Sequence, residues 1–119
     1  MLKVISKENI DSKLVEGVSK KLRLETKEFD LVAFDKFLVS YIFLLAVANK
    51  KVYVYCSDNK KNIAEFDIRE FDNISIQKKV DLNLYLNSGK VINLTSVVGV
   101  KPKVMALVSS LNAEINKLK

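Results

Sequence analysis

Residues 41–55 are the stretch that most constrains how this chain folds. They read Tyr-Ile-Phe-Leu-Leu-Ala-Val-Ala, break once at Asn49-Lys50-Lys51, and resume as Val-Tyr-Val-Tyr. Aromatic and β-branched residues of this kind suit a pleated, half-buried surface. We therefore predict that the stretch forms a β-hairpin at the centre of a sheet.

The apolar run is too short to cross a bilayer as a helix. Residues 37–48 form an unbroken segment of 12 residues, including Ser40, whereas a spanning helix needs about 20. Lys3, Lys7 and Glu8 interrupt the beginning of the chain, so no apolar signal region is expected there. A single cysteine, Cys56, fits a reducing compartment. These features predict a soluble, cytoplasmic protein.

Composition indicates one domain with a basic surface. A chain of 119 residues that is 49% hydrophobic has the length and the apolar content for its own core. The net charge is +6, and 18 of the 20 basic residues are lysines, Arg23 and Arg69 being the others. Arginine is the usual bidentate reader of phosphate and guanine. Its scarcity makes nucleic acid an unlikely partner.

The first half of the chain carries a helical pattern and then strand patterns. Residues 1–21 are predicted to be an N-terminal helical segment, capped by Ser6 or Asp11. Its apolar stripe recurs every four residues at Ile10, Leu14, Val18 and Leu22. Alternation over residues 22–27 predicts a strand, and residues 29–40 predict one or two more, with a turn or bulge at Asp35-Lys36.

The second half alternates between short strands and polar turns. Strands are predicted at residues 64–68, 74–76, 82–86 and 91–97, and turns at 57–62, 78–79 and 87–90. Pro102 stands where a first helical residue is expected, and apolar residues follow it at helical spacing. The predicted class is α+β: a small, strongly bent antiparallel sheet or barrel of six to seven strands, with an N-terminal helix and a capping C-terminal helix.

Several of these segments together resemble a known family. Residues 45–54 form an apolar strand, then Asn49-Lys50-Lys51, then an aliphatic strand; a polar turn, residues 64–68, Ile74-Ser75-Ile76, a hairpin with Gly89 and a final helix follow. This order is similar to that of bacterial pleckstrin-homology-like (PH-like) domains, over residues 22–119. The resemblance implies a seven-stranded bent barrel, a role in binding rather than catalysis, and a partner groove between the last helix and the sheet.

No catalytic set can be assembled from these residue types. The chain contains no histidine, so the thiol of Cys56 lacks the usual base. Gly-rich phosphate loops and the spacings of metal-binding carboxylates or cysteines are also absent from the sequence. We therefore expect no enzymatic activity, no cofactor and no metal.

Lysine pairs and tyrosines are the candidate contact residues. Three pairs lie at predicted turns, Lys50-Lys51, Lys60-Lys61 and Lys78-Lys79. Lys20-Lys21 ends the predicted N-terminal helical segment, and Lys101 and Lys103 flank Pro102. If Lys50, Lys51, Lys78 and Lys79 share one rim of the barrel, each would attract anionic lipid by about 1 kcal/mol. The alternative is that these lysines are only solvated turn residues that keep strand edges from pairing. Tyr53, Tyr55 and Tyr85 are either a protein-contact face or ordinary cross-strand neighbours.

These observations predict a non-catalytic cytosolic binding or adaptor module. Protein–protein interaction, with self-association included, is the first hypothesis. Peripheral binding to anionic membranes through lysine-rich loops is the alternative, and nucleic-acid binding is a weaker one. The sequence does not select a particular ligand.

Overall fold

The computed structural model describes residues 1–26, 28–59, 62–95 and 101–119. Within these residues the chain forms two antiparallel sheets and two α-helices, α1 (Ser12–Leu22) and α2 (Pro102–Lys117). The first sheet has the order β1 (Leu2–Ser6), β2 (Leu31–Phe37), β3 (Ser40–Ala48), β4 (Lys51–Cys56), β5 (Ala64–Asp67). The second has the order β6 (Phe71–Gln77), β7 (Asp81–Leu86), β8 (Val91–Thr95). Short 3-10 turns occupy Lys7–Asn9, Ser57–Asn59 and Ile68–Glu70.

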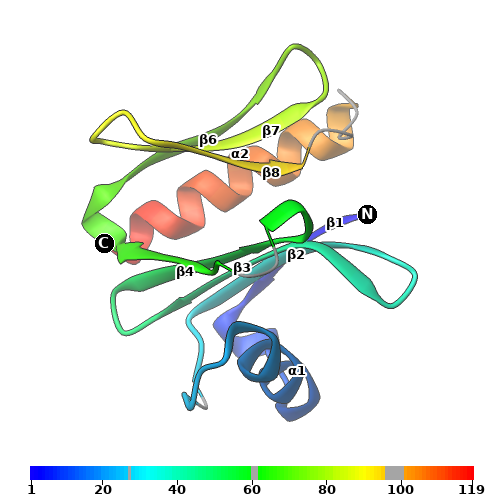
Figure 1. The fold of residues 1–119 in the computed structure, drawn as a ribbon, viewed down its shortest axis with the longest axis vertical. Helices are drawn as coiled ribbons and strands as arrows, with labels where there is room; N and C mark the ends of the chain where they lie inside the picture. Colours follow the sequence, from blue (N-terminus) through cyan, green and yellow to red (C-terminus); the bar gives the residue numbers. More distant parts are fainter. Residues whose placement is uncertain (27, 60–61, 96–100) are drawn as a thin grey trace.

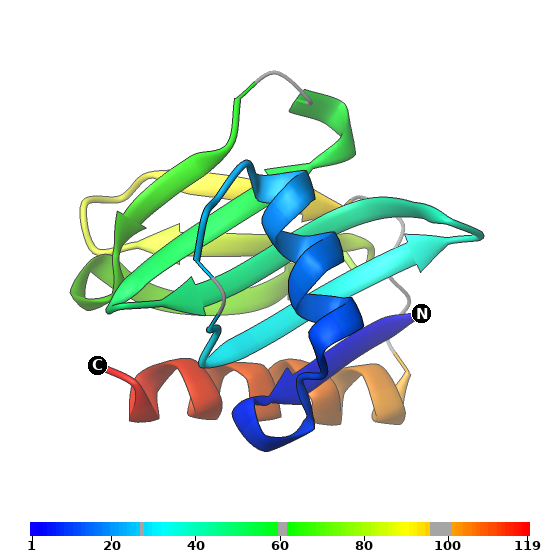
Figure 2. The same ribbon diagram turned by 90° about the horizontal axis from the view of Figure 1, so that it is seen from below.

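The elements stack in layers around the five-stranded sheet. Figure 1 shows α1 on one side of this sheet and the three-stranded sheet on the other. Helix α2 lies between the two sheets along one side, where it contacts β1, β2 and β6 (Figures 1 and 2). The predicted α+β class is confirmed, but the sheet does not close into a barrel.

Strand β3 is buried on both faces, which explains why its sequence is continuously apolar. Phe43, Leu45 and Val47 face the core between the two sheets and α2, whereas Leu44 and Ala46 face the cluster under α1. A strand covered on both faces reads as an apolar run rather than as an alternation. The predicted hairpin at the centre of the sheet is confirmed: β3 pairs with β4 through the two-residue turn Asn49-Lys50.

Helix α1 follows the predicted stripe, with Val18 and Leu22 buried beneath it. The Asp11 side chain caps its first turn by accepting a hydrogen bond from the Leu14 N–H at 2.8 Å. The predicted strand over residues 22–27 is wrong. Leu22 ends the helix and Arg23 adopts a left-handed conformation with φ 57°, because the four-residue stripe outweighs a short alternation; Lys27 lies outside the described residues.

The N-terminal segment also contains a strand that the helical pattern did not predict. β1 pairs antiparallel with β2, from Leu2 opposite Asp35 to Ser6 opposite Leu31. The N-terminal segment therefore supplies an edge strand of the five-stranded sheet. With β1 the described strands number eight, one more than the upper predicted number.

The later predictions on turns and helix start agree with the structure. Lys78 and Lys79 have φ of 53° and 66°, and Gly89 has φ of 92°, as tight turns require. Register also shifts between Asp35 and Lys36, so the predicted bulge is present in β2. Pro102 is the first residue of α2. The predicted end of the strand at residues 96–97 lies outside the described residues.

Candidate functional site

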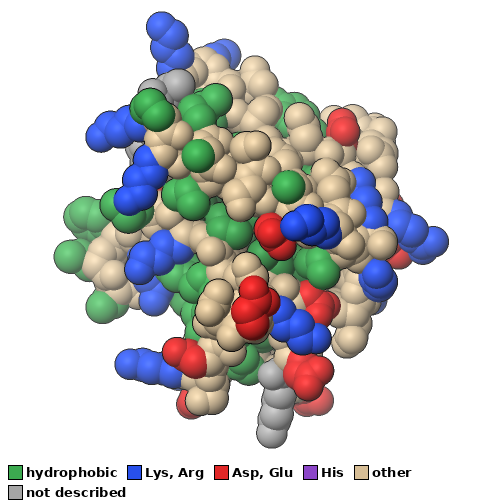
Figure 3. Space-filling view, turned by 180° about the vertical axis from the view of Figure 1, so that it is seen from behind, with side chains coloured by type: hydrophobic (Ala, Val, Ile, Leu, Met, Phe, Trp, Pro, Cys, Tyr) green, Lys and Arg blue, Asp and Glu red, His purple; other side chains and the backbone are tan. Residues whose placement is uncertain are grey.

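The β2–β3 hairpin ends in three exposed apolar side chains. Phe37, Leu38 and Val39 are 71%, 83% and 90% exposed; we call these three residues the apolar tip. The β3–β4, β6–β7 and β7–β8 turns begin instead with Asn49, Lys78 and Asn87, respectively. In Figure 3 the edge where the β2–β3 turn lies carries projecting hydrophobic side chains, with lysine or arginine side chains nearby.

Leu38 adopts a backbone conformation that its residue type disfavours. Its φ is 56°, in the left-handed region that glycine, asparagine and aspartate occupy more readily. A left-handed conformation costs an ordinary L-residue about 1–2 kcal/mol. Lys50, Lys78 and Lys79 adopt the same conformation at their turns, so the turn explains the φ of Leu38. Neither the turn nor core packing requires an exposed apolar side chain at this position.

Lys36 places a cation at the base of the apolar tip. Its Nζ atom lies 4.4 Å from the centre of the Tyr41 ring and 5.7 Å from that of Phe34. The neighbouring carboxylate of Asp35 accepts a hydrogen bond from the Met1 amine at 2.6 Å, which offsets its negative charge. Lys36 itself takes part in none of the ion pairs among the described residues, so its charge is not paired with a carboxylate.

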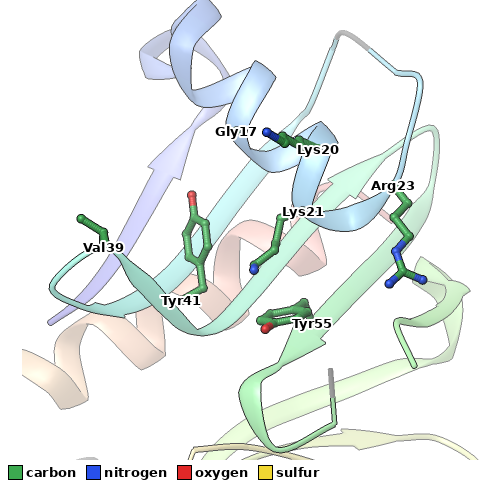
Figure 4. A pocket seen from close by; sticks show the side chains of 7 residues that line it. All are labelled: Gly17, Lys20, Lys21, Arg23, Val39, Tyr41 and Tyr55. Atoms are coloured by element: carbon green, nitrogen blue, oxygen red, sulfur yellow. The ribbon is translucent and has the colours of Figure 1, made fainter. Parts of the chain in front are cut away.

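A basic hollow adjoins the apolar tip between α1 and the outer face of β3 and β4. It has a volume of about 500 Å³ and is lined by Gly17, Lys20, Lys21, Arg23, Val39, Tyr41 and Tyr55. Figure 4 shows the Lys21 side chain reaching down from α1 to the Tyr55 ring, with Tyr41 and Arg23 on either side. Val39 belongs to both the apolar tip and the hollow, so the two features form one continuous surface.

The cations of the hollow are not neutralised by carboxylates. Lys20, Lys21 and Arg23 take part in none of the ion pairs found among the described residues. The Nζ atom of Lys21 lies 4.8 Å from the centre of the Tyr55 ring, within the range of a cation–π contact. The hollow therefore presents three positive charges beside aromatic walls.

The tyrosines predicted as a contact face are less exposed than expected. Tyr55 is 5% exposed and packs in the cluster beneath α1, so it is not part of an exposed face. Tyr53 and Tyr85 are half-buried. The prediction of an exposed tyrosine face is wrong for Tyr55 because α1 covers this face of β4. The strand alternation alone does not show that a helix covers it.

Lys50 and Lys51 are engaged in contacts within the chain. The Nζ atom of Lys50 donates hydrogen bonds to the main-chain oxygens of Leu118, at 2.7 Å, and Lys119, at 3.3 Å. That of Lys51 pairs with the Glu65 carboxylate at 3.3 Å. Their positive charges are thus partly used at the end of α2 and on β5.

The structure does not bring the predicted lysine rim together. The turn that carries Lys50 and the turn that carries Lys78 and Lys79 lie at opposite ends of the molecule (Figure 1). Lys101 and Lys103 are exposed beside the start of α2, and the Lys60-Lys61 pair lies outside the described residues. Of the predicted pairs, Lys20-Lys21 is the one that lines the basic hollow.

The groove between α2 and the sheet is filled at Ile74 by the chain itself. Asn112 on α2 accepts a hydrogen bond from the Ile74 N–H at 2.7 Å and donates one to the Ile74 carbonyl at 2.8 Å. Lys119 donates to the Phe71 carbonyl at 2.8 Å. These side chains satisfy backbone groups on the β6 edge that an added peptide strand would need.

The titratable groups offer little nucleophilic chemistry. Burial, followed by the nearby charge of Asp58, raises the pKa of the Cys56 thiol to about 11, so the thiol stays protonated at neutral pH. Hydrogen bonds from Arg69 lower the pKa of Asp67 to about 2.

No group of three or more metal-ligating side chains occurs in the part of the chain that the structure describes. No helix in that part is long and apolar enough to cross a membrane.

The sequence alone did not point to the apolar tip. Between Lys36 and Ser40 it places three apolar residues, Phe37, Leu38 and Val39, without a glycine, proline or asparagine that would mark a turn. The apolar character of the three residues merges with the run that follows. The turn becomes visible only once Phe37 is known to pair with Ser40.

Comparisons with known proteins do not identify this chain. No protein-family model, curated protein or solved structure matches it.

Proposed function

We propose that this protein is a non-catalytic module that docks on anionic membrane surfaces by inserting the apolar tip. The observation that carries the proposal is the exposure of Phe37, Leu38 and Val39, at 71%, 83% and 90%, on one projecting turn. Fully burying such a side chain gains about 1.5–3 kcal/mol. Shallow insertion of three therefore supplies a useful part of the binding free energy.

The charges beside the apolar tip complement an anionic surface. Lys36 lies at its base, and Lys20, Lys21 and Arg23 line the adjoining hollow. A lysine or arginine near such a membrane contributes about 1 kcal/mol. An apolar anchor flanked by cations is the usual pairing in peripheral membrane binding. The membrane alternative from the sequence is thus kept, with the contact moved from the predicted lysine rim to the β2–β3 turn.

A PH-like scaffold is part of the proposal. Its support is the element order: β2 to β5 form one antiparallel meander, β6 to β8 form a second, and α2 packs along the side between the sheets. Two features lie outside the resemblance, namely β1 with α1 at the beginning and the separation into two unclosed sheets. In this scaffold the β2–β3 turn projects from the five-stranded sheet.

Protein–protein interaction, the first hypothesis from the sequence, has less support. Its expected groove, between the last helix and the sheet, is occupied at Ile74 by Asn112. Tyr55, a proposed contact residue, is buried. A protein partner that covers the apolar tip is the outcome to consider if vesicles are not bound.

Co-sedimentation with vesicles tests the proposal. The protein is mixed with phosphatidylcholine vesicles with and without an anionic lipid, at low and high salt. We expect binding that requires the anionic lipid and weakens with salt, because screening shortens the range of the lysine charges. The matched control replaces Lys78 and Lys79 with glutamine and should bind nearly as well as the wild type. Absence of binding to anionic vesicles at low salt would overturn the proposal.

A further inference from the structure

The edges of the two sheets differ in what covers them. Among the described strands, β1 and β5 are the edges of the first sheet, and β6 and β8 are those of the second. Helix α2 packs along β1 and β6, whereas β5 and β8 lie on the side of the molecule away from α2 (Figure 2). An edge strand presents a row of backbone donors and acceptors with which another strand can pair. In the described part of the chain, β5 and β8 are therefore the edges that α2 leaves open to a further strand.

The register of β5 shows which of its backbone groups face outwards. Residues opposite each other in an antiparallel pair alternate between pairs that exchange hydrogen bonds and pairs that do not. The Ile68 N–H donates to the Lys50 carbonyl at 2.9 Å, one step beyond the pair that Asp67 forms with β4. The backbone groups of Asp67 and Glu65 therefore point away from β4, towards the open edge. The Glu65 side chain is exposed, whereas that of Phe66 faces the core.

The edge of β8 turns towards the first sheet. The Leu86 N–H donates to the Lys90 carbonyl at 2.9 Å. By the same alternation, the backbone groups of Val91 and Asn93 point away from β7. One contact agrees with this direction: the Asn93 carbonyl accepts a hydrogen bond from the Cys56 thiol on β4, with 3.4 Å between oxygen and sulfur. The two open edges thus border the same corner of the molecule.

A hollow lies at this corner. It has a volume of about 640 Å³ and is lined by residues of β4, β5 and β8 and of the loops that precede β5 and β8. Val54, Ala64 and Ile92 give it an apolar wall that is continuous with the core between the sheets. Successive side chains of a strand point to opposite faces. A strand laid along β5 would therefore place every second side chain against this wall and the others in solvent.

Two charged residues of the hollow give such a strand a direction. Asp58 precedes β5 and Lys90 precedes β8, and neither takes part in the ion pairs found among the described residues. In Figures 1 and 2 the β7–β8 turn lies at the beginning of β8, and the 3-10 turn with Asp58 lies nearer its end. A strand antiparallel to β5 complements these charges with an acidic residue at its beginning, near Lys90, and a basic residue at its end, near Asp58.

We propose that this hollow binds an extended peptide segment of a partner protein, which pairs antiparallel with β5 and adds a strand to the first sheet. The segment is aliphatic at alternate positions, acidic at its N-terminal end and basic at its C-terminal end. Main-chain hydrogen bonds supply affinity in strand addition, and the sites for alternate side chains supply specificity. The apolar tip belongs to a different turn, so peptide binding does not depend on the proposed membrane docking.

A synthetic peptide, acetyl-Glu-Val-Thr-Val-Thr-Val-Lys-amide, is the probe. It is titrated into isotope-labelled protein, and backbone amide signals are followed by NMR. We expect saturable binding, with shifts concentrated on β5 and β8 and slower solvent exchange of the Glu65 and Asp67 amides. Shifts confined to other surfaces, or absence of binding at about 1 mM peptide, would overturn the proposal.

Two N-methylated versions of the peptide separate strand pairing from general apolar contact. Beside β5 the threonines share the outer face with Glu65, so their N–H groups point towards β5 and those of the valines point away. Methylation of two threonine nitrogens should weaken binding about thirtyfold, the effect of two lost hydrogen bonds. Methylation of two valine nitrogens is the matched control and should change the affinity by less than about twofold. Equal losses in the two versions would contradict pairing with β5.

A charge reversal tests the direction of the peptide. Asp58→Lys should weaken binding of the probe about fivefold and favour a second peptide that ends in glutamate instead of lysine. Asp72→Lys, the same change on β6, is the control and should keep the wild-type preference. Both replaced side chains are exposed, so both variants should fold. If Asp58→Lys keeps the preference for the peptide that ends in lysine, the antiparallel arrangement is wrong.

Discussion

Two hairpin turns of the same sheet have nearly opposite characters. The β3–β4 turn is Asn49-Lys50, whose lysine amine is bonded to main-chain oxygens at the end of α2. The carbonyl of Lys50 also accepts a hydrogen bond from the Ile68 N–H at 2.9 Å. The β2–β3 turn is Leu38-Val39, exposed and apolar. The turn with the charged sequence thus serves the fold, and the turn with the core-like sequence is available for contact.

This contrast shows why residue type alone misplaces a binding surface. In the sequence, the lysine pair at the β3–β4 turn looks available for a ligand, but the fold places hydrogen-bond acceptors within its reach. The three apolar residues of the β2–β3 turn resemble core residues, but the strand register places them at an exposed turn. A binding surface is better indicated by a residue whose type does not suit its position, such as an apolar side chain exposed at a turn. Residues that do suit their positions are already explained by packing or by turn chemistry.

The largest effect should come from removing the apolar tip. The triple variant Phe37→Ser, Leu38→Asn, Val39→Thr is expected to bind anionic vesicles about a hundredfold more weakly, from about 1 kcal/mol per partly inserted side chain. Its midpoint in urea should stay within error of the wild type or rise, since none of the three side chains is buried. Vesicle co-sedimentation and urea denaturation measure the two quantities. Unchanged vesicle binding would remove the tip from the contact.

Lys50→Met should lower stability and leave vesicle binding nearly unchanged, the reverse of the triple variant. The variant keeps the length of the side chain but loses the hydrogen bonds to the end of α2, which should cost about 1 kcal/mol of unfolding free energy. Vesicle binding should change little, since the turn lies across the molecule from the apolar tip. Denaturant melts and co-sedimentation check both. If binding falls as far as in the triple variant, the lysine turn is the contact after all.

Leu38→Asn is expected to move stability and binding in opposite directions. Asparagine tolerates the left-handed conformation, so relief of the φ of 56° should raise stability by up to about 1 kcal/mol. Loss of the leucine should weaken vesicle binding about fivefold. Thermal denaturation and co-sedimentation are the measurements. A destabilised variant would mean that Leu38 has a packing role.

Cys56 provides the smallest test, because it reports on the sheet away from both turns. Its pKa, raised from 9.0 to about 11, means that the fold favours the neutral thiol. That contribution to stability is complete below pH 9 and is lost as the pH rises through 11. Alkylation by iodoacetamide should therefore be slow at pH 8, accelerate towards pH 11, and stay equally slow when vesicles are present. Rapid alkylation at pH 8 would show that the thiol is not protected.

Local patterns predicted much of the fold. The central hairpin and α2 carry strong signals within one segment: a broken apolar run for the first, and Pro102 with a helical stripe for the second. β1 was missed because a short edge strand depends on β2, about 30 residues away, for its pairing. The predicted strand after Leu22 failed because a single buried residue belonged to two competing patterns.

The candidate site was less predictable because it depends on distant contacts. The acceptors of Lys50 lie 68 and 69 residues further along the chain. The burial of Tyr55 on β4 depends on α1, and β2 and β3 lie between the two elements in the sequence. The basic hollow combines residues from α1, β4 and the β2–β3 hairpin. No single window of the sequence contains these relationships.

Fluorescence from a tryptophan placed at the apolar tip tests the central claim most directly. The chain contains no tryptophan, so Phe37→Trp introduces one reporter at an exposed position. With anionic vesicles its emission should shift to shorter wavelengths and be quenched by lipids brominated on their acyl chains. A Tyr53→Trp variant, placed on β4 away from the tip, is the control and should show neither change. Emission from position 37 that is unaltered by vesicles, whether or not the protein sediments with them, would contradict insertion of the tip.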